Sequence, residues 1–216
     1  MKGRFLVLEG IDGCGKTTQI NHLANWLPKS GLMPKQSTLH ITREPGGTDL
    51  GILIRQLLLN THKTNSPTPM AELLLYAADR AQHISNKIVP ALARGDWVLS
   101  DRFSGSTIAY QGFGRKLNMN IIKELENIAT QGISPDITIW LDIEVQESLN
   151  RRKQCSNDRI ENEGKDFLKA VSEGFGLLAK ERDWVRVSAE YEAQEVSKRI
   201  EKDRIGFRLP VSARRN

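Results

Sequence analysis

Short apolar runs alternate along this chain with longer segments in which apolar residues recur every three or four positions. The short runs are typical of buried strands, and they lie at residues 5–8, 38–41, 97–99, 137–141 and 184–187. The longer segments are typical of amphipathic helices, and they include residues 17–27, 70–92 and 121–129. Strands that alternate with helices predict an α/β fold, with a five-stranded parallel sheet flanked by helices.

The carboxyl ends of these strands are the expected place for a functional site. Right-handed crossovers bring the strand ends, and the loops that follow them, to one edge of a parallel sheet. Glycine, aspartate and arginine gather in segments near that edge, at residues 10–17, 43–48, 101–105 and, one helix further on, 151–159. We therefore expect the side chains of these segments to share one site.

The composition is that of one globular domain, since the 216 residues are 39% hydrophobic and 26% charged. We expect this domain to cover residues 1–207. No apolar run is long enough to span a bilayer, and the first residues lead straight into an apolar strand, so we expect a cytoplasmic protein without a membrane partner. The two cysteines, Cys14 and Cys155, match no zinc or redox spacing, and we expect reduced thiols.

The net charge of +5 is concentrated at the end of the chain. Residues 198–216 carry seven Lys or Arg and two Asp or Glu, so this segment accounts for the whole excess. No aromatic stacking pattern, of the kind that binds single-stranded nucleic acid, accompanies it. We expect residues 208–216 to be a solvated basic tail, and we expect no nucleic-acid partner.

A glycine-rich loop after the first strand carries the clearest chemistry. Residues 10–17 match G-x-x-x-x-G-K-[ST], directly after a predicted strand and before a predicted helix. Backbone N–H groups of such a loop bind phosphates, while Lys16 reaches the β and γ oxygens and Thr17 ligates Mg²⁺. The pattern predicts that ATP binds at Gly10, Ile11, Asp12, Gly13, Cys14, Gly15, Lys16, Thr17 and Thr18. The Cys14 thiol could have a lowered pKa at the helix start or be a small filler, and we favour the filler.

Several classes of protein share this loop. A GTPase needs a guanine-reading Asn-Lys-x-Asp, and residues 86–89 of this chain read Asn-Lys-Ile-Val without the acid. Motor ATPases surround the loop with larger domains, so a compact kinase fits the length better. An ATPase that acts as a partner-regulated switch and a non-catalytic nucleotide-binding module remain as alternatives.

Asp101 and Arg102 follow the third predicted strand. From this position a carboxylate can reach Mg²⁺ or its water shell, while the neighbouring guanidinium binds a phosphate. The alternative is a turn stabilised by its own ion pair. Asp142 ends another strand and is a rival metal ligand, although we favour it as a helix-start residue.

Four segments resemble thymidylate kinase in order and spacing: EGIDGCGKTT at 9–18, TREPGGT at 42–48, YAADRAQH at 76–83 and DRFSGSTIAYQG at 101–112. PDITIWLD at 135–142 and DRIE at 158–161 extend the resemblance to roughly residues 3–190. It implies a three-layer P-loop nucleoside monophosphate kinase fold and a homodimer. The implied reaction transfers the γ-phosphoryl group of Mg-ATP to dTMP, with another pyrimidine monophosphate as the nearest alternative acceptor.

The resemblance also implies roles for residues around the acceptor's sugar and phosphate. Asp12 would hold the 3′-hydroxyl, and Arg55 and Arg102 would bind the phosphate. Tyr110 is similar to the aromatic residue that crowds the sugar 2′ position, with ordinary core packing as the alternative. Glu9 would hold water, orient the acceptor or be a buried partner of Arg102.

Three further residues are implied to recognise the base. Tyr76 would stack on the thymine ring, as its flat apolar face allows. Arg80, one helical turn later, would donate to a base oxygen. Thr107 would complete recognition of the base edge.

The polar stretch at 151–159 is interpreted as part of a lid at about residues 150–161, with a solvated charged loop as the alternative. A lid supplies positive charge to the transferring phosphoryl group. Thymidylate kinases carry either an arginine inside the phosphate loop or a glycine there and arginines in the lid. With Gly13 in the loop, the chain resembles the second form. The resemblance therefore implies a catalytic cation from Arg151, Arg152 or Arg159, beside Lys16 and Arg102. Lys153 and Cys155 depart from the usual lid pattern and leave open which cation acts.

Overall fold

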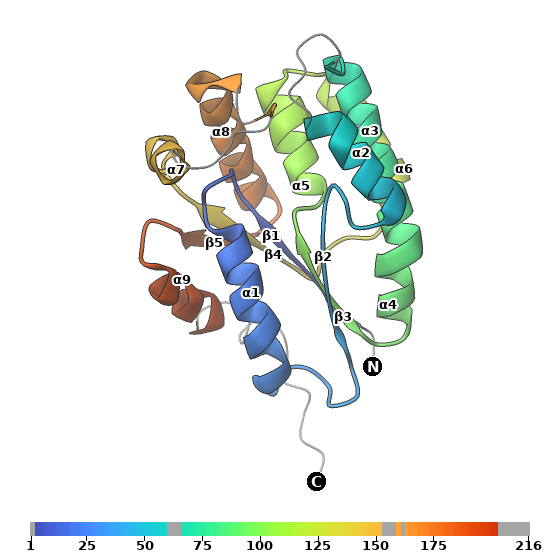
Figure 1. Ribbon diagram of the computed structural model, residues 1–216, viewed down its shortest axis with the longest axis vertical. Helices are drawn as coiled ribbons and strands as arrows, with labels where there is room; N and C mark the ends of the chain where they lie inside the picture. The colour runs from blue at the N-terminus through green and yellow to red at the C-terminus, as the bar shows by residue number, and fades with distance from the viewer. Residues whose placement is uncertain (1–2, 60–65, 153–158, 161–162, 203–216) are drawn as a thin grey trace.

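The computed structural model describes residues 3–59, 66–152, 159–160 and 163–202. These residues form a parallel sheet with strand order β2-β3-β1-β4-β5 and helices on both faces (Figure 1). The strands are β1 (Phe5–Glu9), β2 (Leu39–Arg43), β3 (Trp97–Asp101), β4 (Ile137–Asp142) and β5 (Val185–Ser188). The prediction of a five-stranded parallel sheet flanked by helices is confirmed.

The helices extend over the segments predicted from periodicity. They are α1 (Lys16–Trp26), α2 (Asp49–Leu59), α3 (Pro69–His83), α4 (Val89–Ala93), α5 (Ser104–Thr107), α6 (Met119–Thr130), α7 (Val145–Arg151), α8 (Lys165–Glu181) and α9 (Ala193–Ile200). Shorter 3₁₀ or π-helical pieces are η1 (Leu27–Lys29), η3 (Ile84–Ile88) and η4 (Ile108–Gly114). The single helical pattern predicted over 70–92 is thus divided, because π-helical η3 separates α3 from α4. None of the helices in the described part of the chain is both long and apolar enough to cross a membrane.

The alternation of side chains along β1 explains why helices cover both faces of the sheet. Successive residues of a strand point to opposite faces. Leu6 and Leu8 belong to the larger core cluster, which includes residues of α1 and α8. Phe5 and Val7 belong to a second cluster with residues of η3 and α4. Every residue of β1 is buried, as expected for the central strand of a three-layer α/β fold.

The register of the strands aligns their carboxyl ends at one edge. Leu8 pairs with Asp101 on one side and with Ile139 on the other, and Arg43 also pairs with Asp101. The loops after β1, β2 and β3 therefore leave the sheet side by side. Because the strands are packed in the core, they hold the ends of these loops, and therefore their polar residues, in fixed positions.

Candidate active site

The phosphate loop connects β1 to α1 at the carboxyl edge of the sheet. Gly15 precedes the helix with a φ of 93°, a conformation that favours glycine. The ammonium group of Lys16 donates hydrogen bonds to the carbonyl oxygens of Gly10 and Ile11, both at 3.0 Å. The loop lines a cleft of about 820 Å³ together with Thr17 and Thr18. N–H groups at the start of α1 and the Lys16 ammonium make this cleft suited to a polyphosphate.

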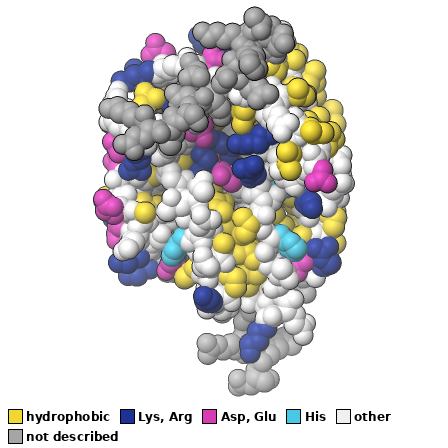
Figure 2. Space-filling view, viewed as in Figure 1, with side chains coloured by type: hydrophobic (Ala, Val, Ile, Leu, Met, Phe, Trp, Pro, Cys, Tyr) yellow, Lys and Arg dark blue, Asp and Glu magenta, His cyan; other side chains and the backbone are white. Residues whose placement is uncertain are grey.

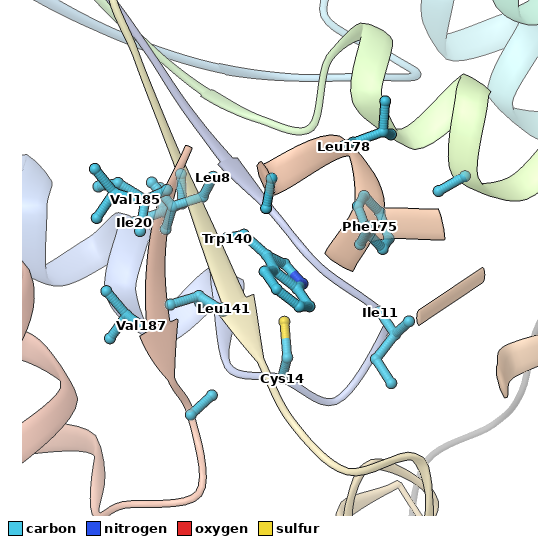
Figure 3. Close-up of a cluster of buried hydrophobic side chains, with 14 of the residues drawn as sticks. Leu8, Ile11, Cys14, Ile20, Trp140, Leu141, Phe175, Leu178, Val185 and Val187 are labelled. Carbon is cyan, nitrogen blue, oxygen red and sulfur yellow. The ribbon is translucent and has the colours of Figure 1, made fainter. Parts of the chain in front are cut away.

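The underside of the loop is held by the core. Cys14 is 2% exposed and belongs to the larger core cluster, and Figure 3 shows its side chain among Ile11, Trp140 and Leu141. Burial raises the pKa of the Cys14 thiol. The prediction that Cys14 is a small filler agrees with this position, because a buried thiol with a raised pKa is poorly reactive.

Asp12, Arg102 and Tyr110 form a hydrogen-bonded cluster above the loop. The Arg102 guanidinium donates to Oδ1 of Asp12 at 2.7 Å and to the carbonyl of Gly10 at 2.9 Å. The Tyr110 hydroxyl donates to Oδ2 of Asp12 at 3.2 Å. Although burial opposes it, the charges of Arg102 and Lys16 hold the pKa of Asp12 well below its usual range. Asp12 is therefore ionised and fixed next to the phosphate cleft.

Glu9 anchors the turn that carries Arg102. Its Oε1 accepts hydrogen bonds from the backbone N–H groups of Phe103 and Ser106, and its Oε2 accepts one from the Ser106 hydroxyl at 2.6 Å. Arg102 has a φ of 74°, which is strained for a residue other than glycine. None of the three interpretations offered for Glu9 names this role, since its hydrogen bonds go to Phe103 and Ser106 and hold the turn that carries Arg102.

Glu9 makes stability depend on pH in a predictable direction. Burial raises the pKa of the Glu9 carboxyl from 4.5 to about 7, although Ser106 and Arg102 oppose this. The stability associated with its protonation is full below pH 4.5 and is lost as pH rises through about 7. The free energy of unfolding of the wild type, minus that of Glu9→Gln, should fall by up to about 3 kcal/mol across this window. Urea titrations at several pH values measure this difference, and Glu124→Gln, at an exposed position, should show none.

A smaller pocket of about 70 Å³ opens beside the phosphate loop. Every residue that the sequence assigned to the acceptor lines it: Asp12, Arg55, Tyr76, Arg80, Arg102, Thr107 and Tyr110. They come from the phosphate loop, from α2 and α3, and from the segment after β3. Asp12, Arg55 and Arg102 also line the large cleft, so the two cavities are adjacent. Figure 2 shows Lys and Arg side chains gathered in the middle of this face.

A buried ion-pair network holds Arg80 at the base of this pocket. Its Nε donates to Glu44 at 2.8 Å, and its Nη1 donates to the Thr107 hydroxyl at 2.9 Å and to Glu126 at 2.5 Å. Glu44 also contacts Nδ1 of His83 at 2.9 Å. Arg80 is 1% exposed. Its guanidinium is thus fixed in the pocket wall by acceptors from three different segments.

The three candidate lid arginines occupy different places. Arg151 and Arg152 line the large cleft, and Arg151 donates to the carbonyl of Ala189 at 2.9 Å. Arg159 instead donates to the carbonyl of Leu58 at 2.9 Å and forms a short ion pair with Glu72. The rest of the predicted lid at 153–158 and 161, and the predicted tail at 208–216, lie outside the described residues.

Thr17 and Asp101, the predicted metal ligands, both line the large cleft. Oδ1 of Asp101 is buried and has no hydrogen-bond partner among the described residues. Such an oxygen fits Mg²⁺ or one of its water ligands. Within the described ranges no group of three or more His, Cys, Asp or Glu could hold a metal by itself. A magnesium ion here would therefore need phosphate oxygens and water as its remaining ligands.

Asp142 does not share this site. Its carboxylate accepts hydrogen bonds from Arg186 on the adjacent strand, at 2.8 and 2.5 Å. The interpretation of Asp142 as a helix-start residue is wrong, because α7 begins at Val145 and Glu144 occupies the position before it. Since β5 pairs directly with β4, Arg186 lies within reach of the Asp142 carboxylate and binds it.

Comparison with known proteins decides the family. The family model described as thymidylate kinase matches residues 8–200. The chain belongs to the thymidylate kinase family. It is 63% identical over 201 residues to "Thymidylate kinase" of Prochlorococcus marinus (strain MIT 9313), a match that covers 93% of each chain. It is 60% identical over 202 residues to "Thymidylate kinase" of Synechococcus sp. (strain CC9605), a match that covers 94% of this chain and 97% of the relative.

The structure explains why this thymidylate kinase family member has glycine at position 13. Gly13 has a φ of 80°, and a Cβ atom there would lie 2.8 Å from the carbonyl oxygen of Ser148 and 3.1 Å from Cγ of Arg152. A side chain at position 13 and the side chain of Arg152, which directly follows α7, would thus compete for the same space. Ser148 also donates to the carbonyl of Asp12 at 2.6 Å, which ties α7 to the loop.

One wall of the large cleft was not predicted from the sequence. It follows β5 and includes Ala189, Glu190, Tyr191, Glu192, Ala193 and Val196. The signal was available, because the loop after the fifth strand also leaves the carboxyl edge of the sheet. Arg199 lies 3.9 Å from the centre of the Tyr191 ring and stabilises this wall by a cation–π contact. Glu44 lies in the segment 43–48 that was expected at the site, but its role as a partner of Arg80 was not predicted. Glu126 was missed altogether, and no local motif marks it.

Proposed function

We propose that this chain transfers the γ-phosphoryl group of Mg-ATP to dTMP, giving ADP and dTDP. The observation that carries this is the adjacency of the two cavities. The phosphate-loop cleft and the acceptor pocket share Asp12, Arg55 and Arg102 in their walls. A donor phosphate in one and an acceptor phosphate in the other would therefore meet beside these residues, as in-line transfer requires.

Positioning and charge account for the catalysis in this proposal. Lys16 would move its ammonium from the Gly10 and Ile11 carbonyls to the β and γ phosphates. Arg102 would bind the acceptor phosphate, and Arg152 would supply positive charge from the lid side. The acceptor is already a phosphate anion, so no strong general base is needed, and no covalent intermediate forms.

The pocket wall supports selection of a deoxypyrimidine. Tyr76 offers an aromatic face for the base, while Arg80 and Thr107 offer polar groups to its edge. The Tyr110 ring packs near Phe175, as core packing would have it, while its hydroxyl contacts Asp12, which supports a place for it beside the sugar. Asp12, ionised and fixed, is suited to accept a hydrogen bond from the sugar 3′-hydroxyl.

Magnesium would be held by Thr17 and Asp101, directly or through water, and would neutralise charge on the β and γ phosphates when bound. The buried and unpartnered Oδ1 of Asp101 supports this assignment. Of the alternatives, a switch ATPase would have no use for a pocket whose wall includes all the residues assigned to the acceptor. Another pyrimidine monophosphate remains the alternative acceptor, and an experiment must distinguish it from dTMP.

A coupled assay of ADP release with a panel of nucleoside monophosphates tests the proposal. We expect kcat/KM for dTMP to exceed those for UMP and CMP by at least about 10². Comparable values for the three acceptors would contradict dTMP as the substrate. ADP release that is independent of any monophosphate would instead indicate an ATPase.

The family resemblance also supports a homodimer, which we include in the proposal. Large apolar side chains are exposed on three helices: Leu50, Leu53 and Leu57 on α2, Met70 and Leu74 on α3, and Ile121 and Ile128 on α6. Figure 2 shows hydrophobic side chains along the side where α2 and α3 lie in Figure 1. Exposed apolar faces of this kind mark interfaces between subunits. Sedimentation equilibrium should give twice the chain mass, and a monomer at micromolar concentration would contradict this.

A further inference from the structure

Glu126 is a buried carboxylate that is linked to the acceptor site through two residues of its wall, Arg80 and Thr107. It lies on α6, is 6% exposed, and is not among the residues that line either the phosphate cleft or the acceptor pocket. Its Oε1 accepts a hydrogen bond from Nη1 of Arg80. Burying a carboxylate is costly, so its place beside Arg80 calls for a function.

The contacts of Arg80 show which of its donors are already used. Glu44 takes the Nε–H, while Thr107 and Glu126 take the two hydrogens of Nη1. Among the described residues, no bond from Nη2 is present. The planar guanidinium is thus held at Nε and at Nη1, and the two hydrogens of Nη2 are the donors left over in a side chain that lines the pocket.

A guanidinium fixed in this way can only donate. The edge of thymine carries the O4 acceptor at the place where cytosine carries the N4 amino donor. A fixed donor therefore favours thymine and leaves two donors opposed if cytosine binds. A guanidinium that could rotate, or move aside and let water in, would lose much of this discrimination.

We propose that Glu126 is a positioning residue that sets the preference for dTMP over dCMP by fixing the orientation of Arg80. The inference rests on the proposed function, since it assigns the base-reading role to Arg80. Glu44 shares the task but also lines the phosphate cleft and contacts His83, so its removal would have several effects. Glu126 lines neither cavity, so its replacement acts on the pocket from outside, through Arg80 and the Thr107 hydroxyl that also accepts from Arg80.

The test compares Glu126→Leu and Glu126→Gln with the wild type, using Glu124→Leu as a control at an exposed position of the same helix. kcat and KM are measured separately for dTMP and dCMP. For Glu126→Leu we expect KM for dTMP to rise about tenfold with little change in kcat, and kcat/KM for dCMP to stay within about twofold. The preference for dTMP should thus fall about tenfold. Glu126→Gln keeps an acceptor oxygen and should retain most of the preference for dTMP. Glu124→Leu should change the kinetic constants for neither acceptor.

An unchanged ratio of kcat/KM for dTMP and dCMP in folded Glu126→Leu would overturn the inference, and so would an equal loss for both acceptors. If Glu126→Leu does not fold, Glu126→Asp withdraws the carboxylate from Arg80 and keeps its charge. The ratio of kcat/KM for dTMP to that for dCMP should then fall in Glu126→Asp, and an unchanged ratio would again overturn the inference. Failure of the wild type to phosphorylate dTMP would refute the proposed function itself, which separates the two failures.

Discussion

Replacing Lys16 by methionine should lower kcat by about 10³ while the chain remains folded. The ammonium group of Lys16 is the donor in the phosphate loop that can follow the β and γ oxygens as charge develops on them. Methionine fills similar volume but donates no hydrogen bond, so it removes transition-state stabilisation and leaves the core packing of the loop in place. A coupled assay of ADP release gives kcat, and thermal unfolding checks the fold.

Lys29→Met provides the matched control. Lys29 is exposed at the end of η1, so this substitution removes the same charge from the chain and should leave kcat within about twofold. A Lys16→Met chain that retained more than about a tenth of the wild-type kcat would show that another cation contacts the transferring phosphoryl group.

The effect of Lys16 should extend to the acceptor side, because the two subsites share charges. Lys16 lies 3.7 Å from Oδ1 of Asp12, the same oxygen that accepts from Arg102. When Lys16 turns to the donor phosphates, Asp12 is left to Arg102 and Tyr110. In the proposed site the phosphate loop therefore serves both substrates, since its Asp12 is part of the wall of the acceptor pocket.

Local patterns predicted the parts of this site that depend on consecutive residues. The loop at 10–17 and the turn after β3 were found because a strand, a glycine conformation and a charged residue follow one another in sequence. The strands were found because a central parallel strand is a short, continuous apolar run. The fold followed from these features and from the handedness of crossovers.

The residues that were missed depend on how distant elements pack. Glu126 meets Arg80 only because α6 lies against α3, and neither helix carries a motif for the contact. Arg159 was grouped with the other lid cations by composition, yet its partner Glu72 lies on α3. A charge in a polar stretch does not reveal its partner, because the partner depends on how that segment packs against a helix distant in sequence.

The candidate lid arginines should differ sharply in their effects. Replacing Arg152 by methionine should lower kcat by about 10² to 10³, because its stem lies against Gly13 and, in the proposed mechanism, its charge stabilises the transferring phosphoryl group. It also helps to lower the pKa of Asp12, although burial of Asp12 opposes this and Arg102 and Lys16 contribute more. Arg152→Lys should recover part of the lost rate, since it restores charge without the planar fork.

Arg159→Met is the informative comparison. Its main expected effect is on stability, because it removes one of the partners of the buried Glu72 carboxylate, while Arg115 and Gln111 remain. We expect a loss of about 1–3 kcal/mol in the free energy of unfolding, and a kcat within about tenfold of the wild type. Steady-state kinetics and urea unfolding on both variants separate the two roles. If kcat falls further in Arg159→Met than in Arg152→Met, then Arg159 must leave Glu72 and bind the phosphates during turnover. The catalytic cation would then be Arg159 and not Arg152.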